Sequence, residues 1–313
     1  MKRVQKRWVL VIAFVVNVLW AVSGHAQQQP MYSQYMFNMM NINPAYAGSR
    51  GVTSMTALFR DQWVNMPGSP KTASVSVDMA VKQKKIGLGL QLYDDRLGVE
   101  RTMGLNLAYA FRIQTSEKGT LSLGLQAGIL NYRANYTGLS TFQSNDPAFS
   151  QNVNGILPAA AAGIYYNSDR FYIGASVPAL LKTKINNNNV VDINSVTGRD
   201  LHFYVTSGFV TDINEDLVLK PSVMIKSASG APLELDLNLN LWIKNTLSVG
   251  GSYRTGDAYV GMVEWQMNRQ LRFGYAYDKT FSNLGIYNNG THELMLRLEI
   301  GQEGSKMVSP RYF

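Results

Sequence analysis

Few side chains in this 313-residue sequence could perform acid–base or nucleophilic chemistry. The absence of cysteine excludes a thiolate nucleophile, a cysteine-bound zinc ion and a disulfide framework. The histidines are His25, His202 and His292. A Ser–His–Asp hydrolase would need one of them beside an activated serine, but the sequence contains no Gly-x-Ser-x-Gly turn. Because a lone histidine in a strand or at a loop edge is usually structural, we predict no catalytic residue and no enzymatic activity.

Two oxygen-rich stretches contain candidate calcium ligands. Asp94 and Asp95 are adjacent, and residues 186–189 are four consecutive asparagines. Neither stretch has EF-hand spacing, so solvated turns are favoured over metal sites. No glycine-rich loop is followed by Lys-Ser or Lys-Thr, which argues against a phosphate cradle. We predict neither a metal site nor a cofactor site.

The N-terminus has the three parts of a secretory signal peptide. A basic stretch comes first, an apolar run from Trp8 to Val22 follows, and Gly24-His25-Ala26 places small residues where signal peptidase cleaves. An uncleaved anchor helix is disfavoured because the run is short and contains Asn17. Removing residues 1–26 lowers the formal net charge from +8 to +4, and the main support for nucleic-acid binding is lost. The removed basic residues are Lys2, Arg3, Lys6 and Arg7.

Beyond residue 50, apolar residues alternate with polar or small ones. In 233–243, for example, Leu237 and Leu239 share one face while Asp236 and Asn238 share the other. Since successive side chains of a strand point to opposite faces, this pattern indicates strands with one apolar face. We expect fourteen strands, at 51–60, 72–80, 86–94, 101–113, 120–133, 156–166, 171–179, 201–211, 217–227, 233–243, 246–254, 258–267, 270–277 and 292–300.

The lengths of these strands and connections distinguish a membrane barrel from a soluble sandwich. Many strands run to about ten residues, as a tilted strand needs to cross a bilayer, whereas strands of ordinary sheets average about five or six. Short turns alternate with connections as long as 134–155, 180–200 and 278–291. A spanning sheet must close, because lipid cannot satisfy a free edge. The predicted fold is an all-β transmembrane outer-membrane barrel of about 14 antiparallel strands with both termini periplasmic.

Aromatic and basic residues agree with such a barrel. Basic residues inside strands would be costly toward lipid, so we expect Arg112, Lys220, Arg272 and Arg297 to face a polar lumen. Aromatic residues fall near the strand ends, where membrane barrels carry aromatic girdles. We expect girdle positions at Tyr93, Tyr132, Tyr253 and Tyr277 near the long connections, and at Trp242 and Trp265 near the short turns.

Residues 27–50 do not alternate and are rich in aromatic, methionine and asparagine residues. A barrel of this size has more room inside than an eight-stranded one, which side chains fill. We therefore expect this segment to sit in, or cap, the periplasmic mouth as a plug. The predicted organisation is a signal peptide at 1–26, a plug-like segment at 27–50, the barrel at 51–300 and a periplasmic tail at 301–313.

The plug-like segment and first strand carry three motifs in order. They are Ser33-Gln34-Tyr35-Met36-Phe37-Asn38, Ile42-Asn43-Pro44-Ala45-Tyr46-Ala47-Gly48-Ser49 and Phe59-Arg60-Asp61-Gln62-Trp63. Together they resemble the N-terminal signature of the PorP/SprF family, outer-membrane proteins of the type IX secretion and gliding-motility system of Bacteroidetes. The resemblance runs from about residue 31 to the C-terminus, with Met39-Met40 a departure from the pattern. The motif positions with an expected structural role are Tyr35, Asn38, Asn43, Pro44, Ala45, Tyr46, Gly48, Arg60, Gln62 and Trp63.

The resemblance implies an integral protein of the bacterial outer membrane that supports secretion or surface anchoring of type IX cargo, such as adhesins with a type B C-terminal domain. The implied partners are the cargo or that domain, the lipid bilayer, and other secretion or motility components at the periplasmic face, but not nucleic acid. The long loops are polar and asparagine-rich, which suits hydrogen bonding to a partner backbone. We expect cargo contacts at Tyr136, Phe142, Asn145, Asn187, Asn188, Tyr287 and Asn288.

Two other functions stay open. The barrel could be a diffusion channel or a transporter of hydrophobic solutes, which conductance or uptake by the purified protein would support. An outer-membrane hydrolase ranks last, because it would need His202 or His292 in a titratable cluster at the long-loop rim.

Overall fold

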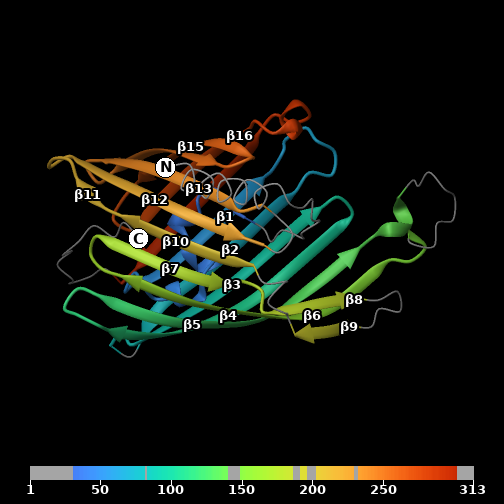
Figure 1. The fold of residues 1–313 in the computed structure, drawn as a ribbon, viewed down its shortest axis with the longest axis horizontal. Coiled ribbons are helices and arrows are strands. Elements are labelled where there is room, and N and C mark those ends of the chain that lie inside the picture. The colour runs from blue at the N-terminus through green and yellow to red at the C-terminus, as the bar shows by residue number, and fades with distance from the viewer. Residues whose placement is uncertain are drawn as a thin grey trace, which may run out of the picture.

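The computed structural model describes residues 31–81, 83–139, 149–185, 191–195, 202–228 and 232–301. Most of these residues form β-strands (Figure 1). No helix in these ranges is long and apolar enough to cross a bilayer. The strands are β1 (Thr53–Asp61), β2 (Lys71–Val81), β3 (Ile86–Leu97), β4 (Glu100–Gln114), β5 (Thr120–Ala134), β6 (Val153–Asn167), β7 (Phe171–Val177), β8 (Leu181–Ile185), β9 (Val191–Ser195), β10 (Phe203–Phe209), β11 (Thr211–Asp212), β12 (Leu217–Ser227), β13 (Glu234–Ile243), β14 (Leu247–Arg254), β15 (Ala258–Gln266), β16 (Leu271–Thr280) and β17 (Thr291–Ile300).

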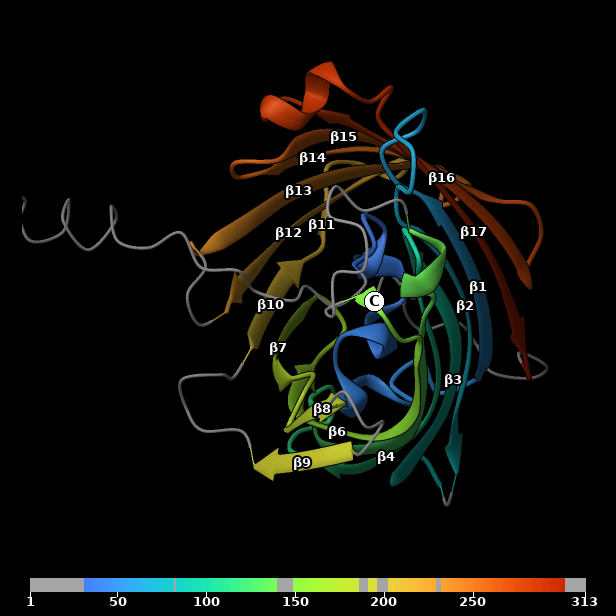
Figure 2. The same ribbon diagram turned by 90° about the vertical axis from the view of Figure 1, so that its right-hand side faces the viewer.

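Fourteen strands form one closed antiparallel ring, which confirms the predicted all-β barrel of about fourteen antiparallel strands. Consecutive strands pair from β1 through to β7, and again from β12 through to β17. The ring closes where β1 pairs with β17, from Thr53–Ile300 to Asp61–His292, and where β10 pairs with both β7 and β12. The short strand β11, which follows β10 in the chain, also pairs with β12. Figure 2 shows this ring of strands around a central space.

The connections at the two ends of the barrel differ in length. The end that we name the short-turn rim carries 82–85, 115–119, 168–170, 213–216, 244–246 and 267–270. The opposite end, the long-connection rim, carries 62–70, 135–152, 178–202 and 281–290 together with three shorter connections. This alternation follows the pattern expected from the sequence.

Two details of the strands differ from the prediction. The expected strand 201–211 is divided at Val210, which lies between β10 and β11 and whose backbone N–H donates to the carbonyl of Arg170 at 2.8 Å. Within the connection 178–202, β8 and β9 pair as a separate hairpin, where the sequence reading predicts only loop. Neither detail alters the ring.

Side chains alternate between the interior and the outer surface of the barrel. In β13, Asp236 and Asn238 are buried, whereas Leu237 and Leu239 are 47% and 51% exposed on the outside. Apolar side chains on the outer surface suit contact with lipid. The basic residues expected to avoid lipid lie on the inner face, namely Arg112, Lys220, Arg272 and Arg297.

The predicted aromatic girdles are only partly correct. Tyr253, Tyr277 and Trp265 lie at outward positions of their strands. Trp242 instead lies on the inner face, where its ring centre is 5.3 Å from the guanidinium carbon of Arg272. Tyr93 and Tyr132 also occupy inward positions. In these three cases the two-residue alternation of the strand decides whether the aromatic side chain points inward or outward, and its nearness to a rim does not.

Residues 31–52, which we name the lumenal segment, lie inside the ring and appear in blue in Figure 2. The segment folds into three short 3₁₀ turns, η1 (Tyr35–Phe37), η2 (Met39–Asn41) and η3 (Pro44–Tyr46). Its apolar side chains are almost all buried, and with inward residues of the strands they form the largest hydrophobic cluster in the described part of the chain. The interior therefore combines polar walls with an apolar core. The sequence predicted the polar lumen but not the apolar core.

Candidate functional site

The lumenal segment runs the length of the barrel. Near its start, Ser33 contacts Asp278 and Glu293, which lie beside the long-connection rim. Near its end, Arg50 contacts Glu299, one residue before β17 ends at the short-turn rim. The segment thus spans the interior, instead of occupying only the short-turn mouth where we expected a plug.

The motif Asn43-Pro44-Ala45-Tyr46 has a local explanation. The Asn43 side chain caps η3 by accepting a hydrogen bond from the Ala45 N–H at 2.9 Å, and Pro44 occupies the first helical position. The Asn43 amide also donates to the carbonyl of Ile164 in β6, at 3.0 Å. These residues both form the turn and attach it to the wall.

Glycines in the wall allow the backbone of the segment to approach closely. A Cβ on Gly124 would lie 2.1 Å from the Ala45 nitrogen, and one on Gly163 would lie 2.1 Å from the Asn43 Oδ1. A Cβ on Gly87 would lie 1.9 Å from the Ala47 carbonyl oxygen. Such distances leave no space for a side chain, so β3, β5 and β6 seal against η3 and the residues that follow it.

The end of the segment is held by a second set of contacts. Gly48 adopts a positive φ of 71°, and its N–H donates to Asp78 at 2.9 Å. The Arg50 guanidinium bonds to Glu299 at 2.9 Å and to the Tyr46 hydroxyl at 3.0 Å. The ring of Tyr46 packs edge-on against Tyr165, with ring centres 5.4 Å apart. These contacts fix the chain where it enters β1.

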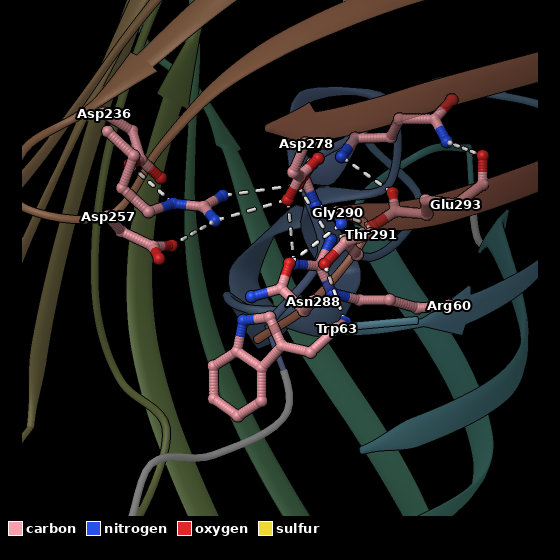
Figure 3. Close-up of polar contacts among 12 residues, drawn as sticks. Arg60, Trp63, Asp236, Asp257, Asp278, Asn288, Gly290, Thr291 and Glu293 are labelled. Carbon is pink, nitrogen blue, oxygen red and sulfur yellow. Dashed lines mark hydrogen bonds and ion pairs between the residues drawn. The ribbon is translucent and has the colours of Figure 1, made fainter. Parts of the chain in front are cut away.

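At the opposite end, four charged side chains form a buried group that we name the mouth cluster: Arg60, Arg254, Asp278 and Glu293. The Arg60 guanidinium lies 2.9 Å from both Asp278 and Glu293, as Figure 3 shows. The Arg60, Asp278 and Glu293 side chains are each at most 4% exposed. Buried charges are tolerated only when paired and hydrogen-bonded, and the ion pairs of Arg60 with both carboxylates meet most of that need.

The mouth cluster binds the start of the lumenal segment through two backbone N–H groups and through the side chains of Ser33 and Gln34. The Glu293 carboxylate accepts the N–H groups of both Ser33 and Gln34, each at 2.8 Å. The Ser33 hydroxyl donates to Asp278 at 2.6 Å and accepts from Arg60 at 2.8 Å. Charge-assisted hydrogen bonds of this kind are about twice as strong as neutral ones.

Arg254 extends the mouth cluster toward the opposite wall. It lies 3.0 Å from Asp236, 3.2 Å from Asp257 and 3.5 Å from Asp278 (Figure 3). The Asp257 side chain is 35% exposed at its edge. The cluster therefore reaches from the buried core to the solvent at the long-connection rim.

The connection 62–70 forms a rigid part of this rim. Trp63 and Asn65 both have positive φ angles, of 53° and 69°, which is rare for a residue as bulky as tryptophan. The Trp63 N–H donates to the Thr291 hydroxyl at 3.1 Å, and Val64 exchanges backbone hydrogen bonds with Gly290 and Asn289. The Gln62 N–H donates to the Pro70 carbonyl. These bonds tie the connection to the start of β17, next to the mouth cluster.

The sequence motifs and the mouth cluster coincide only in part. The motif residues from Tyr35 to Gly48 all belong to the lumenal segment, and Arg60, Gln62 and Trp63 lie at or beside the cluster. The Asn38 side chain donates a hydrogen bond to Ser76, and the Tyr35 hydroxyl accepts one from Asn238. Both residues are thereby held to the wall. Sequence reasoning missed Arg254, Asp278 and Glu293, although all three occupy inward positions of their strands.

The expected cargo-contact residues lie in different surroundings. Tyr287 is 67% exposed in the connection 281–290, whereas Asn288 is 6% exposed and caps this connection by bonding to Leu284 and Gly290. Tyr136 is half-buried and donates to Glu100 at 3.1 Å. The remaining four, Phe142, Asn145, Asn187 and Asn188, lie outside the described residues, as do the expected signal peptide and most of the tail.

The chemistry of the site is that of binding and sealing. Burial raises the pKa of Tyr32 and of Tyr35 well above the usual range of a tyrosine, so both phenols stay protonated. Within the described ranges, no three histidine or acidic side chains come together as a metal site would need. What the arrangement does hold is a peptide segment inside a closed barrel.

Deleting residues 27–46 is expected to open the barrel to ions. The deletion removes η1, η2 and η3, and with them much of the core that fills the ring. The purified full-length protein should then show little conductance in a planar bilayer, whereas the deletion variant should conduct. Equal conductance of the two proteins would show that the segment does not close the lumen.

Comparison with known families gives one match that covers most of the chain. Residues 24–298 match the sequence profile of a family described as type IX secretion system membrane protein PorP/SprF. No curated protein matches the sequence.

Several solved structures of membrane proteins are similar in fold. The monoaromatic hydrocarbon channel CymD is 11% identical, with 88% of this chain and 93% of that chain covered and a TM-score of 0.47. The toluene transporter TodX of P. putida is 11% identical, with 84% and 92% covered and a TM-score of 0.42. The outer membrane protein Omp33 of Acinetobacter baumannii is 10% identical, with 80% and 99% covered and a TM-score of 0.42.

Proposed function

The chain belongs to the PorP/SprF family of type IX secretion system membrane proteins, and on that premise we propose that it supports the export or surface anchoring of cargo proteins. It is an integral barrel of the outer membrane. The cargo that we propose is adhesin-like and carries a type B C-terminal domain. Other secretion or motility components of the envelope are its proposed partners at the periplasmic face.

The observation that carries this proposal is the filled interior. A diffusion channel needs a continuous path through the ring, but here the lumenal segment contacts both ends and packs closely against glycines in the wall. A barrel with an occupied lumen can act as a platform in the membrane, with its connections as the working surface. The filled interior therefore supports a binding role over transport of solutes.

We further propose that the long-connection rim faces the cell exterior. Outer-membrane barrels place their short turns in the periplasm and their longer loops on the outer side. In this orientation Ile300 lies at the periplasmic side, as expected for the tail, and Ser33 lies near the outer mouth. The cargo would then meet the connections 135–152, 178–202 and 281–290.

The connection 281–290 is the best-defined candidate contact. Its side chains Ile286 and Tyr287 are 80% and 67% exposed, and the turn that carries them, η6 (Asn283–Ile286), is fixed by hydrogen bonds of Asn288. Exposed apolar side chains on an ordered turn form a good contact for a partner, since little conformational entropy is lost on binding. Asn288 itself we propose to be structural.

Shortening each of the three long connections in turn should reduce the retention of cargo at the cell surface. The reason is that each shortening removes contact area while the strands and the lumenal segment stay intact. Surface proteins would be measured by protease shaving of intact cells, with shortening of a short turn, 115–119, as the matched control. Unchanged retention in all three variants would contradict the proposed role.

A further inference from the structure

We propose that the mouth cluster is a binding site for an extended peptide segment of a protein partner, which enters in exchange for residues 32–34 of the lumenal segment. The nature of the partner rests on the proposed function, whereas the existence of the site rests on its own contacts. The occupant that the chemistry selects is an extended segment with a small hydroxyl side chain.

The first step is that the site recognises groups that many extended segments share, namely two consecutive backbone N–H groups and one small hydroxyl, besides a contact of the Gln34 amide with the Glu293 carbonyl. Glu293 accepts two consecutive backbone N–H groups, which any two adjacent non-proline residues can offer. The one hydroxyl that it recognises is that of Ser33, which bonds to Asp278 and Arg60 and lies 3.4 Å from Arg254. A serine or threonine in an extended chain would make the same contacts.

The second step is that the present occupant leaves the site incompletely satisfied. Among the described residues, the Arg60 Nε and the Asp278 Oδ1 are buried without a hydrogen-bond partner. Arg60 is 4% exposed and Asp278 is 2% exposed, so these atoms lack bulk water as well. A buried polar atom without a partner costs free energy, and a segment that reaches these atoms would bind more favourably than residues 32–34 do.

The third step is that the two halves of the lumenal segment are held in different ways. From Asn43 onward the segment is packed against glycines so closely that displacement would require the turn to leave the wall. Ser33 and Gln34 are held by hydrogen bonds that an incoming chain can replace one for one. Exchange limited to these residues therefore conserves the number of bonds and leaves the seal in place.

The fourth step is access. The site lies directly beneath the long-connection rim, next to the connection 62–70, and its Arg254–Asp257 pair extends to a partly exposed carboxylate. A chain approaching from this rim meets the mouth cluster before it meets the sealed part of the barrel. The same rim is the one that we propose to face the cargo.

A pair of disulfide locks tests the exchange, and the absence of native cysteine makes each lock specific. Q34C/G274C is designed to pin the start of the segment, because the Gln34 side chain reaches the wall at Gly274, with its amide oxygen 2.3 Å from the place of a Cβ there. A47C/G89C is the matched control and pins the part of the segment that follows η3. Its two Cβ positions lie 3.4 Å apart, near the separation that disulfides need. The probe is a fluorescent synthetic peptide with the sequence of residues 32–38, added to the full chain in detergent micelles.

We expect the oxidised Q34C/G274C protein to bind the peptide at least about tenfold more weakly than its reduced form does. Dithiothreitol should restore binding. The oxidised A47C/G89C protein should bind like the wild type. The variant S33A, whose own segment lacks the hydroxyl, should bind the peptide more tightly than the wild type does. A peptide with alanine in place of its serine should bind more weakly to every form.

Equal binding by the oxidised and reduced Q34C/G274C proteins would overturn the proposal. If that variant does not fold, the absence of peptide binding by both the wild type and S33A would overturn it as well. The outcome is separable from the proposed function. Peptide exchange together with normal cargo retention in the shortened-connection variants would remove the cargo role and leave the site.

Discussion

Replacing Gly124 with valine is expected to turn a closed barrel into a conducting one and to lower its stability. The valine Cβ would lie 2.1 Å from the Ala45 nitrogen and 2.3 Å from the Ala45 Cα, where backbone atoms cannot give way as a flexible side chain can. Overpacking a well-packed core typically costs about 1–3 kcal/mol, and a clash with backbone belongs at or above the upper end. The turn η3 is then expected to move off the wall formed by β4, β5 and β6, which breaks the seal.

The expected conductance of Gly124→Val is measured in planar bilayers, and its stability by urea unfolding in detergent micelles. Gly261→Val provides the matched control, because Gly261 lies at an outward position of β15 and a Cβ there meets no atom within 4 Å. This control should stay closed and unfold like the wild type. A Gly124→Val protein that is as closed and as stable as the control would show that the contact does not seal the barrel.

Arg60→Met is expected to destabilise the barrel by about 3–5 kcal/mol, the cost typical of removing one partner from a buried charge network. Arg60 bridges Asp278 and Glu293, and both carboxylates would remain in a site almost without solvent. Arg254 lies 3.5 Å from Asp278 and still compensates part of its charge. The loss of stabilisation therefore concerns mainly Glu293 and the segment that it holds. The start of the lumenal segment should become more accessible to protease.

The effect of Arg60→Met is measured as the shift in the free energy of unfolding in micelles, with limited proteolysis to follow the segment. Lys71→Met is the control in the neighbouring strand, because Lys71 pairs with Asp61 at 3.3 Å but is 55% exposed. An exposed pair is worth at most about 1 kcal/mol, so the control should change little. Similar losses for both variants would contradict a special role for the mouth cluster.

The ring of strands could be predicted from the sequence because its signal is local and repeated. Each strand shows its own two-residue alternation, and the alternation also assigned Asp236 and Asn238 to the interior. Aromatic positions were predicted less well where nearness to a rim was given more weight than the alternation. Trp242 is the clearest case, since it follows Asn238 and Asn240 on the same inward face.

The mouth cluster was harder to predict because its members come from strands that are remote in sequence. Arg60 stands within a motif, but Asp278 and Glu293 each look like one more polar residue on an inward face. Their association depends on the ring closure of β1 with β17, which pairs Arg60 with Glu293. The small hairpin β8–β9 did carry a signal, since Leu181, Thr183 and Ile185 alternate with lysines, but the segment is too short to be distinguished from loop.

The contacts of the lumenal segment also set the order in which this protein can fold. Ser33 and Glu293 are 260 residues apart, and Tyr35 meets Asn238 across 203 residues. Contacts of such long sequence separation form late and slowly, because a large loop must close before they contribute. The start of the segment is therefore among the first parts of the barrel-forming chain to leave the ribosome and among the last to find its partners. Until β17 arrives, Ser33 and Gln34 have no Glu293 to bind, and a periplasmic chaperone would have to shield the apolar residues beside them.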